Sequence, residues 1–257
     1  MSALKKRFGQ HFLHDIAVLR GIADVCAAVP GDQTVEIGPG GGALTAHLLA
    51  RFGTLHAIEI DRDLVVDLGQ YFPADRLTIH EADVLRFPIC ARIPGALRVV
   101  GNLPYNISSP LIFHLLDQPR IQSMVFLLQK EVVDRLAATP GGHDYGRLSV
   151  MVQAVCEVSP LFTVPASAFT PPPQVESRLV YLRPIPSRVA AAHAGRFAEI
   201  VAVAFSQRRK MLRHNLKRYF RDGDWKALGI DPTRRAETLT IEEFAALAGY
   251  EAPPGDN

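Results

Sequence analysis

The stretch TVEIGPGGGALT, residues 34–45, decides the fold. Residues 34–37 predict a strand, which enters a turn with glycines at 38, 40 and 42 before the apolar spacing of a helix begins. Glycines let the backbone approach a ligand closely, and the N-terminus of the following helix offers free N–H groups. The stretch therefore predicts a nucleotide-type strand-turn-helix unit within an α/β domain.

Two further predicted strands carry acidic residues. Glu59, in the strand at 55–60, lies about 20 residues beyond the first glycine, where doubly wound folds place the carboxylate that holds a ribose diol. Asp83 ends the strand at 77–83 and suits an adenine amino group as an acceptor. The glycine turn fits both the dinucleotide pattern G-x-G-x-x-A and the Glu-x-Gly-x-Gly-x-Gly turn of S-adenosylmethionine sites. Asp83 partly favours S-adenosylmethionine over a dinucleotide. The alternative is that Glu36 and Asp83 are plain strand-end or cap residues.

The tetrapeptide Asn102-Leu103-Pro104-Tyr105 follows an apolar strand predicted at 97–100. Pro104 holds Leu103 extended, so the Leu103 carbonyl points outward beside the Asn102 amide oxygen. Two neutral acceptors suit an NH2 group, and Tyr105 offers a flat face to a ring. An isolated N-L-P-Y is more often a turn. At the carboxyl end of a central strand, where open α/β sheets bind ligands, it instead predicts a site for the exocyclic amine of a nucleobase.

Two more segments suit a nucleic acid. Near the N-terminus, Lys5, Lys6 and Arg7 precede aromatic and amide side chains, a composition suited to a phosphate backbone and a bound ring, with a solvated tail as the alternative. Further on, three prolines at 171–173 predict a stiff extended loop. This loop would hold Phe169 as a rigid stacking wall, and the alternative is a hydrophobic plug.

The character of the chain changes near Pro184, so we predict one domain at 1–186 and a helical RNA-binding domain at 187–257. A single helix is expected at 196–221. From residue 208 to 221 the chain has seven lysines and arginines and no acid, among them Arg208, Arg209, Lys210 and Arg213. Such uncompensated positive charge predicts phosphate contact, and a solvated basic face is the alternative.

Composition limits the remaining possibilities. The 257 residues are 48% hydrophobic, and 28 Lys+Arg against 26 Asp+Glu give a net charge of +2, so a nucleic-acid surface needs local segregation of charge. No apolar run approaches the length of a membrane span, and no signal sequence is evident, so we expect a soluble, cytoplasmic protein without membrane contact. The three cysteines form no C-x-x-C, and His11 and His14 lack a third ligand nearby, so no metal site is predicted.

Five segments together resemble a known family: GQHFL at 9–13, EIGPG at 36–40, GNLPYN at 101–106, FTPPPQVES at 169–177 and FSQRRK at 205–210. They are similar to the bacterial small-subunit ribosomal RNA adenine dimethyltransferases of the KsgA type, nearly end to end. Related enzymes that methylate large-subunit RNA share the cofactor and N-L-P-Y-like motifs. The FSQRRK segment and its continuation favour the small-subunit, ribosome-assembly type.

The resemblance implies a Rossmann-like class I S-adenosylmethionine methyltransferase fold, with a seven-stranded mixed sheet and a small C-terminal all-α domain. It also implies N6,N6-dimethylation of two adjacent adenosines in the 3′-terminal hairpin of 16S rRNA, within an immature 30S particle. Nothing in the sequence suggests an obligate oligomer, so we expect a monomer. The implied cofactor-binding residues are Gln10, His11, Leu13, Glu36, Gly38, Gly40, Glu59, Asp83 and Asn102. Asn102 and the Leu103 carbonyl would grip the target amine, and Tyr105 and Phe169 would stack on its base.

Two rival functions have different requirements. An NAD-dependent oxidoreductase would explain Gly38, Gly40 and Glu59, but it would leave the tetrapeptide at 102–105 and the basic segment without a purpose. A non-catalytic RNA-binding assembly factor would bind immature small subunits even when Asn102 is replaced.

Overall fold

The computed structural model describes residues 11–26, 29 and 31–251. The chain forms two compact units. One contains the described residues up to 133 together with 158–184, and the other contains 134–157 together with the described residues from 185 onward. Packing therefore assigns 134–157 to the second unit, because Tyr145 and Val150 are buried in the same core cluster as Phe197 and Phe244. A functional division at residues 186 and 187 stays a prediction.

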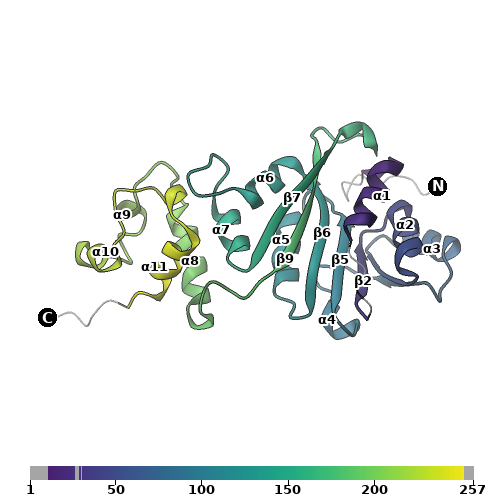
Figure 1. Ribbon diagram of the computed structural model, residues 1–257, viewed down its shortest axis with the longest axis horizontal. Helices are drawn as coiled ribbons and strands as arrows, with labels where there is room; N and C mark the ends of the chain where they lie inside the picture. Colours follow the sequence, from purple (N-terminus) through teal and green to yellow (C-terminus); the bar gives the residue numbers. More distant parts are fainter. Residues whose placement is uncertain (1–10, 27–28, 30, 252–257) are drawn as a thin grey trace. The chain divides into compact units, whose positions relative to one another are not determined.

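A seven-stranded mixed sheet in the order β4-β3-β2-β5-β6-β9-β7 confirms the predicted architecture. Figure 1 shows β2, β5, β6 and β9 side by side. From β4 to β6 neighbouring strands run parallel, and β9 is antiparallel to β6. The strands are β2 (Gln33–Ile37), β3 (Leu55–Glu59), β4 (Leu77–Glu81), β5 (Leu97–Asn102), β6 (Ile121–Gln129), β7 (Cys156–Val164) and β9 (Ser177–Pro184).

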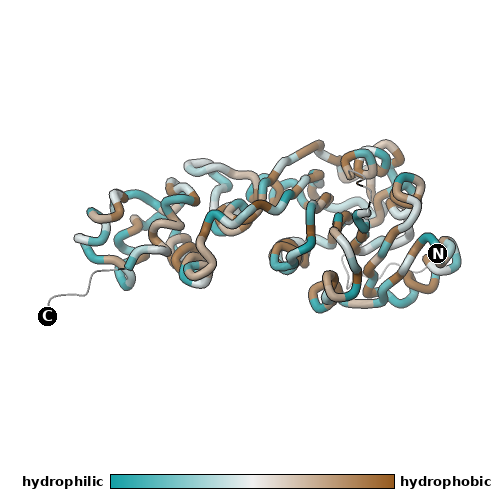
Figure 2. Tube along the Cα trace, turned by 60° about the horizontal axis from the view of Figure 1, so that its bottom comes forward, coloured by the Kyte–Doolittle hydropathy of each residue, from teal (hydrophilic) through white to brown (hydrophobic). Residues whose placement is uncertain are grey.

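Helices α2 to α5 connect the parallel strands, whereas α1 precedes them and α6 follows them in the chain. Asp15 and Asp61 start α1 and α3 as N-caps, each accepting a backbone N–H at 3.1 Å. Figure 2 shows brown and teal segments alternating along the helical turns, as expected of amphipathic helices. Among the described residues, no helix is long and apolar enough to cross a membrane. The helices are α1 (Ile16–Val25), α2 (Ala43–Phe52), α3 (Arg62–Tyr71), α4 (Ile89–Arg92), α5 (Ser108–Leu116) and α6 (Lys130–Ala137).

The order of the strands creates a switch point beside β2. From β2 the chain moves outward to β3 and β4, then returns to β5 on the other side of β2. Open α/β sheets bind ligands at such a point, outside the carboxyl ends of the strands. Gly101 permits the close approach there, since a Cβ on it would lie 2.6 Å from the Ile37 carbonyl oxygen. The ends of β2 and β5 are thereby brought together.

A two-stranded antiparallel ribbon lies outside the main sheet. It pairs β1 (Phe12–Leu13) with β8 (Phe169–Thr170), so that Phe12 faces Thr170 and Leu13 faces Phe169. The ribbon connects the start of the described chain with the proline-rich loop.

The second unit is helical, as the predicted C-terminal all-α domain requires. Its core contains Phe197, Trp225 and Phe244, all of them buried. Thr240 begins the last helix with a capping box, since its hydroxyl accepts the Glu243 N–H at 3.2 Å. Its helices are α7 (Arg147–Gln153), α8 (Ala194–Ala204), α9 (Leu212–Asn215), α10 (Asp222–Leu228) and α11 (Ile241–Gly249).

The prediction of one helix over 196–221 is wrong. The chain leaves the helix after Ala204, turns through 205–210 and becomes helical again only at Leu212. The side chain of Asn215 donates to the carbonyls of Ala204 and Gln207, at 2.7 and 3.1 Å. These carbonyls are therefore satisfied without a continuing helix, and the basic residues 208–210 lie in a turn.

Candidate active site

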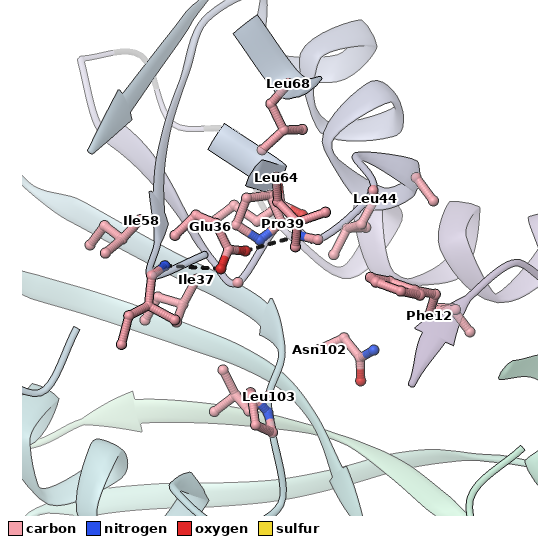
Figure 3. A pocket seen from close by; sticks show the side chains of 18 of the residues that line it. Phe12, Glu36, Ile37, Pro39, Leu44, Ile58, Leu64, Leu68, Asn102 and Leu103 are labelled. Atoms are coloured by element: carbon pink, nitrogen blue, oxygen red, sulfur yellow. Dashed lines mark hydrogen bonds between the residues drawn. The ribbon is translucent and has the colours of Figure 1, made fainter. Parts of the chain in front are cut away.

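A cavity of about 1140 Å³ lies at the carboxyl ends of β2, β3 and β5, within the first unit. Figure 3 shows Leu64 and Leu68 on one side of it and Asn102 and Leu103 on the other. Its volume lies slightly above the usual range for ligand pockets, about 300–1,000 Å³. The cavity brings together most of the predicted site residues: His11, Leu13, Glu36, Gly38, Gly40, Glu59, Asp83, Asn102, Leu103 and Tyr105.

The glycine turn after β2 forms one wall of the cavity. Gly38 and Gly40 have φ of 65° and 57°, in the left-handed region that favours glycine. The Gly38 N–H donates to the Ile58 carbonyl at 3.0 Å, which fixes the turn against β3. A Cβ on Gly40 would lie 2.9 Å from the Phe12 ring, so this position has no room for a side chain.

Glu59 ends β3 with its carboxylate held by backbone groups. Its Oε1 accepts the N–H groups of Ile60 and Asp61, each at 2.9 Å, and its Oε2 accepts the Gly40 N–H at 3.3 Å. Burial raises the pKa of Glu59, and these three N–H groups oppose that shift. The carboxylate is thus oriented toward the glycine turn while it lines the cavity.

Glu36 is the more deeply buried acid, with 1% of its surface exposed. The Thr45 hydroxyl on α2 donates to its Oε2 at 2.6 Å. Burial raises the pKa of Glu36 to about 8, with a smaller contribution from the charge of Glu59. The carboxyl therefore keeps its proton to a higher pH than an exposed glutamic acid does.

Asp83 follows β4 and also reaches the cavity. Its Oδ1 accepts the Leu85 N–H at 3.0 Å, and its Oδ2 lies 3.8 Å from Arg86 Nε. The side chain therefore caps a local turn, as one interpretation of the sequence held. The half-buried carboxylate still has lone pairs with which to accept from a ligand.

Asn102 and Leu103 occupy the end of β5. The Asn102 side-chain NH2 donates to the His11 carbonyl at 3.0 Å, so the amide is oriented with its oxygen as the acceptor. The Leu103 N–H donates to the Leu127 carbonyl at 3.2 Å. Pro104, which has no N–H, then carries the chain into the turn before α5.

Tyr105 and His11 lie face to face. Their ring centroids are 5.8 Å apart with an interplanar angle of 28°. The Tyr105 hydroxyl is hydrogen-bonded to the Ser177 hydroxyl at 2.8 Å, and burial raises the pKa of Tyr105. His11 Nδ1 lies 2.8 Å from the Pro171 carbonyl, so Nδ1 carries the proton and donates it. Tyr105 is thus fixed at both its hydroxyl and its ring.

A family model described as ribosomal RNA adenine dimethylase matches residues 1–252. The chain belongs to this family. Its similar relatives include the ribosomal RNA small subunit methyltransferase A of Aromatoleum aromaticum, 50% identical, with 96% of this chain and 94% of the relative covered. The protein of the same name from Nitrosococcus oceani is 51% identical, with 96% and 95% covered.

Solved structures agree with this dimethylase assignment. A dimethyladenosine transferase from Plasmodium falciparum superposes with a TM-score of 0.75 at 25% identity, covering 92% of this chain and 96% of that one. The 23S rRNA methyltransferase ErmE gives a TM-score of 0.74 at 25% identity, covering 92% and 98%. The protein is a methyltransferase with the predicted Rossmann-like class I fold.

Phe169, the predicted stacking residue, is not among the residues that line the cavity. Only 2% of its surface is exposed, and it packs in the core of the first unit with Leu13, Val164 and Ala168. Its pairing with Leu13 in the β1–β8 ribbon places it there, and stacking of its ring on a base stays a prediction. This burial is what the alternative interpretation, a hydrophobic plug, expects, and the neighbouring Thr170 lines the cavity.

The predicted RNA-binding residues divide into different groups. Arg208 is held by the protein itself: its Nε lies 3.1 Å from Glu237 Oε2, and its guanidinium also donates to the His143 carbonyl. The side chains of Arg209, Lys210 and Arg213 are exposed. Four predicted site residues lie outside the residues that the structure describes: Lys5, Lys6, Arg7 and Gln10.

Several contacts in this dimethylase were missed by sequence reasoning. Phe12 covers Gly40, Thr45 holds Glu36, and Ser177 holds Tyr105. None of these pairings has a signal in the sequence, because each joins segments that only the fold brings together. Gly101 did have one, because it directly follows the strand predicted at 97–100, and a glycine inside a strand, as Gly101 is in β5, often marks a close approach of another backbone.

Proposed function

We propose that this protein uses S-adenosylmethionine to dimethylate N6 of two adjacent adenosines in the 3′-terminal hairpin of small-subunit rRNA, within an immature 30S particle. The observation that carries the proposal is that one cavity is lined both by the glycine turn with Glu59 and by the tetrapeptide from Asn102 to Tyr105. A cofactor site and an amine-binding site are therefore continuous.

The residues of the first wall fit S-adenosylmethionine. The Gly38–Gly40 backbone suits close approach by its amino-acid end, Glu59 can accept from its ribose hydroxyls, and Asp83 from its adenine amine. His11 and Leu13 line the same cavity beside them. When bound, this cofactor supplies an electrophilic methyl group on a sulfonium.

Asn102 and Leu103 would orient the target amine. An adenine amine is a poor nucleophile because its lone pair is delocalised into the ring. The Asn102 Oδ1 and the Leu103 carbonyl, each accepting one N–H, favour a pyramidal nitrogen with its lone pair aimed at the methyl group. Positioning and electrostatics of this kind supply the rate, and the alkylated nitrogen then loses a proton to solvent.

Tyr105 is the aromatic residue best placed to stack on the target base. Its ring lines the cavity next to Asn102, and its hydroxyl is anchored to Ser177. Stacking on a flipped base is typically worth about 1–3 kcal/mol. In the second unit, the exposed cations Arg209, Lys210 and Arg213 are suited to phosphate contact.

The names of the similar relatives support small-subunit RNA as the substrate. The test is tritium transfer from labelled S-adenosylmethionine to unmethylated small subunits, followed by primer extension across the 3′ hairpin. We expect label in dimethyladenosine and extension stops at two adjacent adenosines. Label in large-subunit RNA would instead favour an activity like that named for ErmE, and no transfer to any RNA would refute the proposed function.

A further inference from the structure

The acceptor residue Asn102 is held by a segment 91 positions earlier in the chain. Its NH2 group donates to the main-chain carbonyl of His11 at 3.0 Å. A side-chain amide has an oxygen at one end and an NH2 group at the other, and rotation by half a turn exchanges them. The contact with His11 therefore decides which end faces the cavity.

The position of the His11 carbonyl depends on the β1–β8 ribbon. The ribbon pairs Leu13 with Phe169, and its pairing continues through the His14 N–H, which donates to the Ala168 carbonyl at 3.0 Å. On the other side, the His11 ring donates to the Pro171 carbonyl at 2.8 Å. His11 is thus tied to the proline-rich loop by both its own side chain and its neighbours' backbone.

Burial anchors the ribbon in the first unit. Leu13 and Phe169 are 6% and 2% exposed and belong to one core cluster with strand residues such as Val100 and Leu127. Phe12, which lies between His11 and Leu13 in the chain, packs against Gly40 of the glycine turn. The segment from His11 to Leu13 therefore touches both the proposed cofactor wall and the acceptor amide.

We propose that the β1–β8 ribbon sets the orientation of the Asn102 amide, so that His11 and Phe169 act as positioning residues for methyl transfer. This inference rests on the proposed function, because it assumes that Asn102 accepts from the target amine. Without the His11 carbonyl, the amide can turn its own NH2 toward the substrate amine. Two donors would then face each other, and the acceptor would be lost.

The amide itself gives the first test, which needs no substrate. In protein labelled with ¹⁵N-asparagine, the Asn102 side-chain NH2 signal is assigned by its loss in Asn102→Asp. We expect two well-separated, slowly exchanging protons in the wild type. In His11→Leu, which removes the donor to Pro171, they should exchange faster and move toward the positions of a solvated amide. His11→Asn, whose amide can donate to Pro171, should restore the wild-type signal.

Kinetics separate positioning from cofactor binding. At saturating S-adenosylmethionine, His11→Leu should slow single-turnover methyl transfer by up to about 10²-fold, the cost of a modest misplacement of a reacting group. Because His11 also lines the proposed cofactor cavity, its cofactor Kd is measured separately, and saturation removes the effect of any weaker binding from the rate. His11→Asn should recover most of the rate, and the control His47→Leu on α2 should behave as wild type. A His11→Leu variant with weakened cofactor affinity but a normal rate at saturation would overturn the proposal.

Phe169 distinguishes positioning from base stacking. Phe169→Leu keeps a buried apolar side chain but removes the aromatic ring, so it should retain both the Asn102 signal and the single-turnover rate. Phe169→Ala should lose both. The control Phe162→Leu, on the partly exposed face of β7, should change neither. If Phe169→Leu lost the rate while its Asn102 signal stayed normal, the ring would be contacting the base and the positioning role would be wrong.

The two proposals fail in different ways. An Asn102 signal that is indifferent to His11→Leu and Phe169→Ala overturns the ribbon proposal, even in a fully active enzyme. A wild-type protein with the expected signal but no methyl transfer to any RNA contradicts the proposed function and leaves the orientation of the amide established.

Discussion

The acceptor loop, Asn102–Tyr105, and the basic turn, Arg208–Lys210, are both polar segments, but they are held in opposite ways. In the acceptor loop, contacts with His11, Leu127 and Ser177 fix the direction of each functional group. In the basic turn all three side chains are exposed, although Arg208 is also paired with Glu237. Methyl transfer to one nitrogen requires hydrogen-bonding groups that point in fixed directions. Attraction to a phosphate backbone requires only a high density of positive charge.

The largest effect is expected where the acceptor loop depends on close backbone packing. In Gly101→Ala, the added methyl would meet the Ile37 carbonyl at 2.6 Å and push β5 from β2. We expect a loss of about 3 kcal/mol in the free energy of unfolding, measured by urea denaturation. Gly69→Ala on α3, where nothing lies within 4 Å of the new Cβ, is the control and should be neutral or stabilising. Equal stability of the two variants would contradict this explanation of the switch point.

Glu59→Ala tests the proposed cofactor wall. The loss of a charged acceptor for the ribose should weaken S-adenosylmethionine binding by about 1.5–3 kcal/mol, as measured by calorimetry. The exposed Asp75 lies outside the cavity, so Asp75→Ala should bind the cofactor as the wild type does. The ribose role is refuted if both variants bind with wild-type affinity.

The raised pKa of Glu36 leads us to expect that the affinity for the cofactor depends on pH. Its pKa is about 8 in the ligand-free protein, and a nearby sulfonium would favour the ionised form and lower that pKa. Below pH 8, binding must therefore release a proton, so affinity should rise with pH by up to about tenfold per unit and level off above the free-state pKa. Glu36→Gln should flatten this profile. A pH-independent Kd in the wild type would show that the carboxyl does not sense the ligand.

The smallest effects concern the basic turn and would sharpen its contrast with the acceptor loop. Replacing Arg209 and Lys210 by alanine should reduce the slope of log affinity against log salt by about 1.5 units, if both contact phosphates. Arg208→Ala should leave that slope nearly unchanged and lower the thermal stability, because its partners are Glu237 and the His143 carbonyl. A normal slope in the double variant would mean that this turn is only a solvated face.

Local patterns predicted what depends on short segments. The glycine turn, Glu59 at the end of β3 and the tetrapeptide after β5 each have a signal that needs no distant partner, and all three line the cavity. The sequence left the choice between a stacking wall and a hydrophobic plug open for Phe169, because its burial depends on Leu13, more than 150 residues earlier in the chain. The single helix through the basic segment failed for the same reason at shorter range, since Asn215 satisfies the Ala204 carbonyl. The spacing of apolar residues along the chain predicts neither the Leu13–Phe169 pairing nor the Asn215–Ala204 hydrogen bond.

The most direct test of the account is the single-turnover rate of Asn102→Ala, measured beside its cofactor affinity. The variant removes one of two acceptors that orient the amine, so methyl transfer should fall by roughly 10²–10³-fold, as when a preorganised hydrogen-bonding group is lost. The Kd for S-adenosylmethionine should barely move. If Asn102→Ala methylates small-subunit particles at nearly the wild-type rate, the acceptor loop does not orient the target amine, and the central claim is wrong.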